Sequence, residues 1–154
     1  MIYSIGIIGH GNYPYGVRSA LKLLAGTDDN LSCFNLNDET THEQFKKDVS
    51  QFLDKNESAI IVADMTGGAP FQSIAEIILE ENKKNHYIIS SLPMNAILDI
   101  YLKNSMDQLS PDNIEGQLDH IIKESVNLMQ FLPSSKVDSA TQDDKNESGE
   151  DGWI

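Results

Sequence analysis

Short apolar runs alternate with segments in which apolar residues recur every three or four positions, and this pattern repeats four times along the chain. The apolar runs predict buried strands at residues 2–9, 31–36, 60–62 and 87–90. The segments between them predict helices that each present one apolar face. Four strand–helix units in a row predict an α/β fold, a three-layer α/β/α sandwich with a mainly parallel sheet of four strands.

Residue types at the ends of the predicted helices mark where they begin and end. Gly26 follows the apolar face of the first helix, as expected of a terminating glycine. Thr40, with Glu43 three residues later, predicts a capping box at the start of the second helix. Ser110 followed by Pro111 predicts the start of a fifth helix, with serine as the cap and proline in the first position.

The carboxyl-terminal part of the chain changes character twice. Residues 126–132 fit either a continuation of the fifth helix or a short closing strand. From Pro133 onward the sequence consists mostly of Ser, Asp, Glu, Asn and Gly, with two lysines against six acidic residues. We therefore expect one domain over residues 1–132, followed by an acidic, disordered tail over residues 133–154.

Length, charge and cysteine content narrow the classes of protein that fit this pattern. The 154 residues suffice for one domain with a core. A formal net charge of -13 argues against nucleic acid or an anionic membrane surface as a partner, because both require basic patches. Cys33 is the single cysteine, and no apolar run approaches 18 residues. We expect a cytoplasmic protein without direct membrane insertion.

The turn after the third predicted strand carries the most distinctive chemistry. Thr66, Gly67 and Gly68 precede a helix, and such a turn offers free N–H groups and the positive helix end to an anion. Asp64 in the same turn would repel that anion unless another group stood between them. His10 follows the first strand and could be that group if the two strands are neighbours. A carboxylate bound to one ring nitrogen leaves the other nitrogen unprotonated and nucleophilic.

Each of these features has a more ordinary explanation when taken alone. A histidine just past a strand is more often a loop residue than a nucleophile, and aspartate after a strand is common in α/β proteins. We interpret His42, His86 and His120 as surface or structural histidines. A dinucleotide site is disfavoured because Pro14 occupies the place of the third glycine, and the chain has no P-loop sequence.

Three motifs together resemble one known family. Residues 9–12 (Gly-His-Gly-Asn) resemble the amino-terminal motif of the mannose-type phosphotransferase-system (PTS) EIIA components, the mannose/fructose/N-acetylgalactosamine family. Residues 64–71 resemble the second motif of the family, and Pro93 with Met94 resembles a third. The resemblance covers about residues 1–130, with comparable spacing between the motifs.

This resemblance implies a phosphate relay in sugar uptake. In the family, a histidine-containing phosphocarrier protein phosphorylates EIIA, which passes the phosphate to an EIIB component acting with the membrane components EIIC and EIID. The phosphorylated histidine would be His10, at the ring nitrogen remote from Cβ, and the orienting aspartate would be Asp64. No metal or cofactor is expected. The expected phosphate-binding residues are Gly11, Thr66, Gly67, Gly68 and Ala69. Members of the family are homodimers that exchange a carboxyl-terminal strand, which favours a strand for residues 126–132.

The sequence departs from the family pattern at several places. Ala69 stands where serine is common, and Ser90-Ser91-Leu92 replaces a segment that is often rich in asparagine. Larger members continue into an EIIB domain, whereas this chain ends in an acidic tail, so we expect a free-standing EIIA protein here. The rival hypothesis is a regulatory or binding module that has the same fold but no longer relays phosphate. The presence of both His10 and Asp64 favours the relay.

Overall fold

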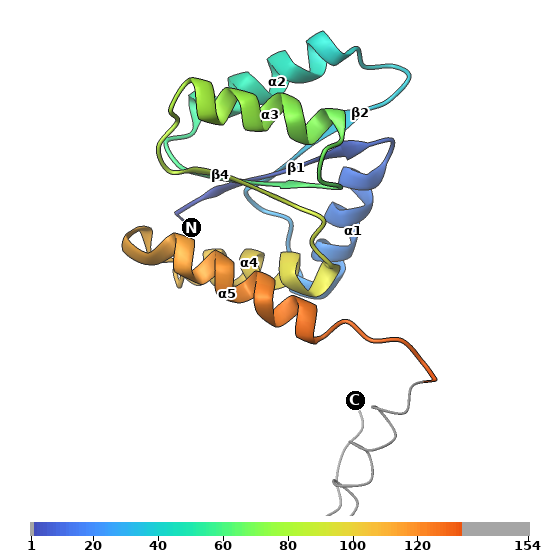
Figure 1. Cartoon of the computed structure of the whole chain (residues 1–154), viewed down its shortest axis with the longest axis vertical. Coiled ribbons are helices and arrows are strands. Elements are labelled where there is room, and N and C mark those ends of the chain that lie inside the picture. Colours follow the sequence, from blue (N-terminus) through green and yellow to red (C-terminus); the bar gives the residue numbers. More distant parts are fainter. Residues whose placement is uncertain (1, 134–154) are drawn as a thin grey trace, which may run out of the picture.

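Four strands form a parallel sheet at the centre of the protein (Figure 1). The computed structural model describes residues 2–133, so the tail predicted for residues 133–154 lies outside the described residues except for Pro133. The strand order is β2-β1-β3-β4, and every pair of neighbours is parallel. The strands are β1 (Ser4–His10), β2 (Leu31–Leu36), β3 (Ala59–Ala63) and β4 (His86–Ser90). The predicted strands and their parallel arrangement are confirmed.

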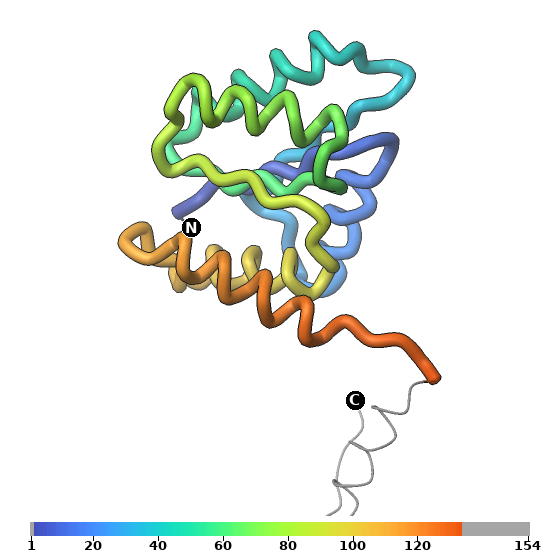
Figure 2. Tube along the Cα trace, in the orientation of Figure 1, coloured from blue at the N-terminus to red at the C-terminus, as the bar shows by residue number. Residues whose placement is uncertain are grey.

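Helices cover both faces of the sheet, which confirms the three-layer sandwich (Figures 1 and 2). One face carries α2 (His42–Lys55) and α3 (Ala69–Glu80), which pack against each other. The other face carries α1 (Tyr13–Ala25), α4 (Met94–Ser105) and α5 (Ile114–Asn127), with α4 in contact with both of the others. No helix among the described residues combines the length and the hydrophobicity needed to cross a bilayer.

The core consists of two apolar clusters, one on each face of the sheet. Successive strand residues point to opposite faces, so Ile5 and Ile7 join the cluster under α1, α4 and α5, whereas Ile8 joins the cluster under α2 and α3. All five residues of β3 are buried, which explains why its sequence is a continuous apolar run. Burial of each such aliphatic side chain contributes about 1.5–3 kcal/mol. The sheet edge that carries the site is therefore continuous with a fully buried central strand.

Two predicted helix starts are wrong in detail. The N-cap of α2 is Thr41, whose hydroxyl accepts a hydrogen bond from the Gln44 N–H at 3.1 Å. Thr40 belongs instead to the turn after β2, because its N–H donates to the Asn37 side chain, and the helix starts one residue later than predicted. Ser110 precedes a short 3₁₀ turn, η1 (Pro111–Asn113), without making a side-chain cap bond, and α5 begins only at Ile114.

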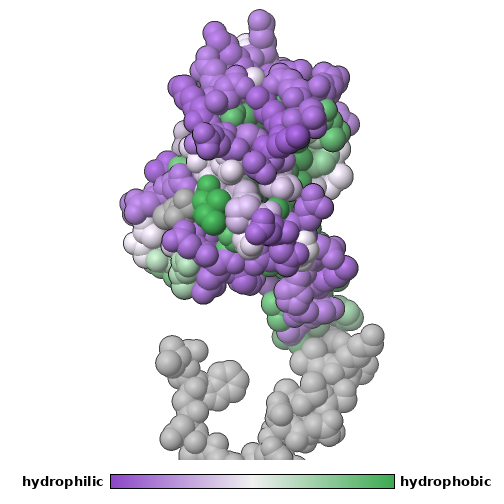
Figure 3. Space-filling model, turned by 90° about the vertical axis from the view of Figure 1, so that its left-hand side faces the viewer, coloured by the Kyte–Doolittle hydropathy of each residue, from purple (hydrophilic) through white to green (hydrophobic). Residues whose placement is uncertain are grey.

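The segment predicted as either helix or strand is helical at its start. Helix α5 continues to Asn127, and no fifth strand is present among residues 2–133. The apolar side chains of this segment are exposed in the single chain, and Figure 3 shows hydrophobic surface close to the point where the described chain ends. They are Val126, Leu128, Met129, Phe131 and Leu132. Strand exchange, which requires a second chain, stays a prediction.

Candidate functional site at the carboxyl edge of the sheet

The site lies where the chain reverses the direction in which it adds strands to the sheet. From β1 the chain passes to β2 on one side, and then returns to place β3 on the other side. The expected pairing of β1 with β3 is confirmed, with Ile8 opposite Ala63. His10 is the last residue of β1 and Asp64 follows β3 directly, so both emerge at the same edge. Crevices at such switch points are the usual ligand sites of open α/β sheets.

His10 and Asp64 form a tight pair. The imidazole Nδ1 lies 2.7 Å from Asp64 Oδ2, and the backbone N–H of His10 donates to the same oxygen at 2.9 Å. The other carboxylate oxygen accepts from the Met65 N–H at 2.8 Å. Because a carboxylate only accepts, Nδ1 carries the proton and Nε2 keeps its lone pair. The His10 side chain is 48% exposed and the Asp64 side chain 12%, so the imidazole is open to solvent while the carboxylate that binds it is largely covered.

The surroundings shift the acidity of two groups at this edge. Burial alone would raise the pKa of Asp64, but the hydrogen bonds from His10 and Met65, together with the positive charge of the His10 ring when it is protonated, outweigh burial and hold that pKa below its ordinary value of 3.8. Burial and the negative charge of Asp64 raise the pKa of Tyr13 above its ordinary value of 10.0. Asp64 is therefore ionised at neutral pH, and Tyr13 remains a neutral phenol.

Two glycines allow the backbone to approach the pair closely. A Cβ atom at Gly9 would lie 2.8 Å from Tyr13 Cδ1 and 3.0 Å from Cβ and Cγ of Asp64. A Cβ atom at Gly68 would lie 3.0 Å from His10 Cε1. The glycine turn therefore lies directly against the imidazole ring.

The start of α3 beside His10 has the features that suit anion binding. Gly68 is the N-cap and, within the described residues, no side chain makes a cap hydrogen bond to this end of the helix. Gly67 has φ +76°, a left-handed conformation that glycine adopts without strain. The first N–H groups of a helix have no partner inside the helix, and they add to the positive end of its dipole. Gly67, Gly68 and Ala69 thus lie at an open helix start beside His10.

The other two predicted phosphate-binding residues are already engaged within the protein. The Gly11 N–H donates to the Leu36 carbonyl at 2.9 Å. The Thr66 N–H donates to Ser91 Oγ at 3.1 Å, and Thr66 Oγ1 lies 2.6 Å from Ser90 Oγ. The structure therefore places Gly11 and Thr66 at the site without leaving their N–H groups free.

The contacts of Ser90 and Ser91 were missed by sequence reasoning, which treated these residues only as a departure from the family pattern. The signal in the sequence that could have revealed these contacts is the pair of adjacent serines at the end of the predicted strand 87–90. His86 is structural as expected, because both its ring nitrogens lie within hydrogen-bond distance of backbone carbonyls. Within residues 2–133, no group of three or more His, Cys, Asp or Glu residues could hold a metal ion.

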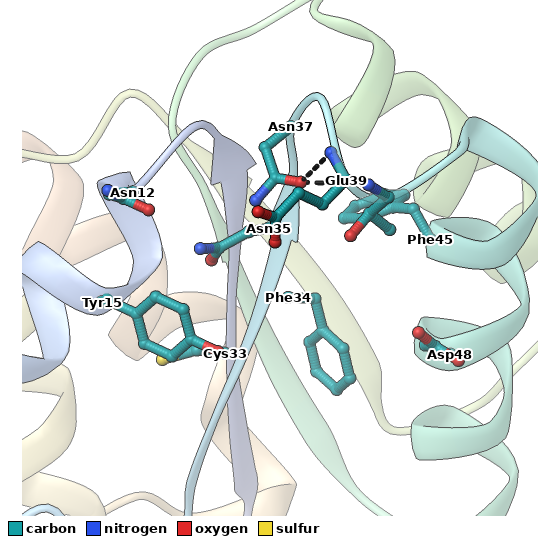
Figure 4. A pocket seen from close by; sticks show the side chains of 10 residues that line it. Asn12, Tyr15, Cys33, Phe34, Asn35, Asn37, Glu39, Phe45 and Asp48 are labelled. Atoms are coloured by element: carbon teal, nitrogen blue, oxygen red, sulfur yellow. Dashed lines mark hydrogen bonds between the residues drawn. The ribbon is translucent and has the colours of Figure 1, made fainter.

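A polar pocket lies near the site, between α1 and α2 and across the edge strand β2 (Figure 4). Asn12 and Tyr15 line it from α1 and the preceding turn, and Asn37 lines it from the turn after β2. The Asn37 side chain accepts from the N–H groups of Glu39 and Thr40, which fixes this wall of the pocket. Asn35 Oδ1 is buried at the same place without a hydrogen-bond partner among the described residues.

This fold and site define the class of protein. A four-stranded parallel sheet carries an oriented, exposed histidine beside an open helix start, an arrangement suited to holding a covalently attached anionic group. The model of the family described as PTS system fructose IIA component, EIIA-man, matches residues 4–113. The chain belongs to this family of mannose-type PTS EIIA components.

Solved structures with the same fold agree with this assignment. The chain is similar to PTS component EIIA from Streptococcus agalactiae, with 22% identity, a TM-score of 0.73, and coverage of 85% of this chain and 97% of that one. It is also similar to the PTS IIA protein associated with the fucose utilization operon of Streptococcus pneumoniae (19% identity, TM-score 0.68, coverage 84% and 93%). The mannose/sorbose-specific IIA subunit from Enterococcus faecalis gives 14% identity, a TM-score of 0.67, and coverage of 87% and 98%.

Proposed function

We propose that this protein is a cytoplasmic phosphocarrier of a sugar phosphotransferase system. His10 accepts a phosphoryl group from the histidine-containing phosphocarrier protein and passes it to an EIIB component, which acts with membrane components EIIC and EIID. The observation that carries the proposal is the 2.7 Å pair between His10 Nδ1 and Asp64, which leaves Nε2 exposed beside the start of α3. Membership of the EIIA family supports the same function.

The transfer follows from the geometry of the pair. Nε2 of His10 attacks phosphorus, and a P–N bond forms as the P–N bond to the donor imidazole breaks and its electron pair returns to the donor. Positive charge then develops on the His10 ring, and the Asp64 carboxylate 2.7 Å away stabilises it. Since the bonds formed and broken are alike, catalysis consists mainly of positioning and charge stabilisation.

Backbone donors at the start of α3 hold the phosphoryl oxygens in this mechanism. Gly67, Gly68 and Ala69 supply N–H groups, and removal of one donor from an oxyanion site typically costs about 3 kcal/mol. Gly11 and Thr66 shape the cradle without donating their N–H groups, because those are engaged elsewhere. The mechanism routes no step through a metal or a cofactor.

The experiment is phosphorylation with purified components. The chain is incubated with phosphoenolpyruvate, the general phosphotransferase enzyme and the phosphocarrier protein, and its mass is measured. We expect one added phosphate, which His10→Ala abolishes. The matched control is His120→Ala, which replaces an exposed histidine on α5. This variant should be labelled like wild type. If no phosphate is added under conditions that label another EIIA protein, the protein is a binding module that does not relay phosphate.

We also propose that the protein is a homodimer in which residues 126–132 are exchanged between subunits. The support is the run of exposed apolar side chains at this end of the chain, including Phe131 at 76% and Leu132 at 72% exposure. Within residues 2–133, β2 and β4 each have an edge that pairs with no other strand, and an added strand would satisfy the backbone groups there.

We infer that the identity of the sugar is set by the membrane components rather than by this chain. The similar solved structures are described with different sugars, fucose in one and mannose/sorbose in another. Mannose, fructose and N-acetylgalactosamine are therefore equally compatible with the site described above.

A further inference from the structure

Three hydroxyl groups join the ends of β3 and β4 beside the phosphate cradle. Thr66 lies in the turn after β3, Ser90 is the last residue of β4, and Ser91 follows it. Thr66 Oγ1 lies 2.6 Å from Ser90 Oγ and 3.3 Å from Ser91 Oγ, and the Thr66 N–H donates to Ser91 Oγ at 3.1 Å. We call Thr66, Ser90 and Ser91 the hydroxyl clamp.

Ser91 links the two strand ends in both directions. Its own N–H donates to the carbonyl of Ala63 at 3.1 Å, while its hydroxyl accepts from the N–H of Thr66. These two bonds bracket Asp64 and Met65, the two residues between Ala63 and Thr66. Ser91 therefore holds the backbone on both sides of Asp64, in addition to the hydrogen bond that the Asp64 N–H donates to the Ile8 carbonyl at 3.1 Å.

The backbone of Ser91 has an unfavourable conformation at this position. Its φ is +59°, in the left-handed region that residues other than glycine, asparagine and aspartate seldom adopt. A strained residue persists only where its surroundings hold it, and such residues concentrate at functional sites. The hydrogen bonds with Ala63 and Thr66 are the contacts that hold Ser91 here.

The clamp matters because this cradle depends on backbone groups. Ala69 provides no hydroxyl at the start of α3, so phosphoryl oxygens would be held by the N–H groups of Gly67, Gly68 and Ala69. The directions of those N–H groups are set by the turn that begins at Thr66. A flexible glycine pair keeps a precise geometry only when the residue before it is anchored.

We propose that Ser90 and Ser91 are positioning residues for phosphoryl transfer, acting through Thr66 on the Gly67–Gly68 turn and on Asp64. This inference rests on the proposed phosphocarrier function and adds residues to it. Ser91 makes the larger contribution, because it holds a backbone N–H, whereas Ser90 contacts only the Thr66 side chain. Loss of the clamp lets both the N–H donors and the carboxylate drift from the reacting geometry.

The test separates positioning from folding through the choice of variant. Ser91→Gly removes the hydroxyl and also relieves the positive φ, so the melting temperature should stay at or near the wild-type value. The rate constant for single-turnover transfer from the phosphorylated phosphocarrier to His10 should fall about 10- to 100-fold, with KM for the phosphocarrier unchanged. Ser90→Ala should give a smaller loss in the same direction.

Two further variants make the result specific. Ser91→Asn should recover most of the rate, because asparagine tolerates the left-handed conformation and its side-chain oxygen can accept the Thr66 N–H. Ser105→Ala removes a hydroxyl that bonds within α4, and it should transfer phosphate like wild type. A Ser91→Gly variant with the wild-type rate constant, or a loss that appears only in KM, overturns the proposal.

A second measurement does not depend on phosphate transfer. The ¹⁵N resonances of the His10 ring report its tautomer, and the ¹H–¹⁵N heteronuclear NOE reports the order of the Gly67 and Gly68 amides. Ser91→Gly should reduce the population of the Nδ1–H tautomer and lower the NOE of both amides. Unchanged values overturn the clamp. If wild type accepts no phosphate but the variant shows these changes, the proposed function fails and the clamp stands.

Discussion

Gly68 brings the turn of α3 into contact with the imidazole ring of His10. A Cβ atom there would meet His10 Cε1 and Met65 Cγ, each at 3.0 Å. Such a contact is tighter than side chains normally tolerate, so either the ring or the turn must move by a few tenths of an ångström. Substitution at this position therefore tests the alignment of the nucleophile with its anion-binding donors.

We expect Gly68→Ala to slow phosphoryl transfer to His10 by about tenfold, because small misplacements of reacting groups are costly. The measurement is the single-turnover rate constant with the phosphorylated phosphocarrier. Gly16→Ala is the matched control, because Gly16 lies in α1, and a Cβ atom there would have no neighbour within 4 Å. That control should keep the wild-type rate and gain a little stability, since alanine favours the helix. Equal rates for both variants would contradict this close contact.

Asp64 sets the orientation of the His10 ring and the position of its proton. Asp64 accepts three hydrogen bonds, two from His10 and one from the Met65 N–H. These bonds hold its pKa below the ordinary value despite burial, so the carboxylate stays charged under conditions in which the protein acts. The charge keeps the proton of the imidazole on Nδ1, which leaves Nε2 as the nucleophile of the proposed transfer.

Helix starts are the elements whose positions differ most from the sequence prediction. Thr40 and Thr41 are adjacent and chemically identical, so local sequence does not distinguish them as caps. The Asn37 side chain accepts a hydrogen bond from the N–H of Thr40, which holds Thr40 in the turn after β2 and leaves Thr41 as the cap. Thr41 is then free to accept from Gln44 N–H as the N-cap of α2.

This assignment predicts different costs for two otherwise equivalent substitutions. Thr41→Ala should lower the free energy of unfolding by about 1 kcal/mol, the usual cost of losing an N-cap. Thr40→Ala should change it by less than about 0.5 kcal/mol, since the hydrogen bond to Asn37 uses the backbone N–H. Urea unfolding followed by circular dichroism measures both. A larger loss for Thr40→Ala than for Thr41→Ala would show that the helix starts at the earlier residue.

Residues 126–132 carry exposed apolar side chains that the proposed dimer would bury. Helix α5 ends at Asn127, and the apolar residues after it find no cover within the described chain. Apolar surface of this kind is costly in water unless a partner buries it. A second copy of the chain would supply that cover through the proposed exchange.

At the scale of the whole molecule, we expect light scattering to give twice the mass of one chain. The double substitution Phe131→Asp and Leu132→Asp places charges in the proposed interface and should yield the monomer mass. Leu23→Asp is the control, because Leu23 is 86% exposed but lies on α1, outside residues 126–132. It should remain dimeric. A monomeric wild-type protein would refute the exchange.

Periodicity was sufficient to predict the strands and the presence of the helices, and the succession of strand–helix units predicted the parallel sheet. Each of these elements is encoded locally, because an apolar run fits a buried strand and a three-to-four spacing fits a helix face. The chemistry of the site was also visible, since His10, Asp64 and the glycine pair each follow a predicted strand. The sequence was therefore enough to predict the fold class and to single out His10 and Asp64 as side chains that could meet at one edge of the sheet.

How these parts meet depends on packing between segments that are distant in the sequence. The strand order β2-β1-β3-β4 places His10 beside Asp64, and strand order depends on packing between distant segments rather than on local pattern. The same packing engages the N–H of Gly11 with Leu36 and that of Thr66 with Ser91. Hydrogen bonds between residues distant in sequence form only when the strands are aligned. For that reason the residues of the site could be predicted from the sequence. Which of their N–H groups are engaged within the protein could not.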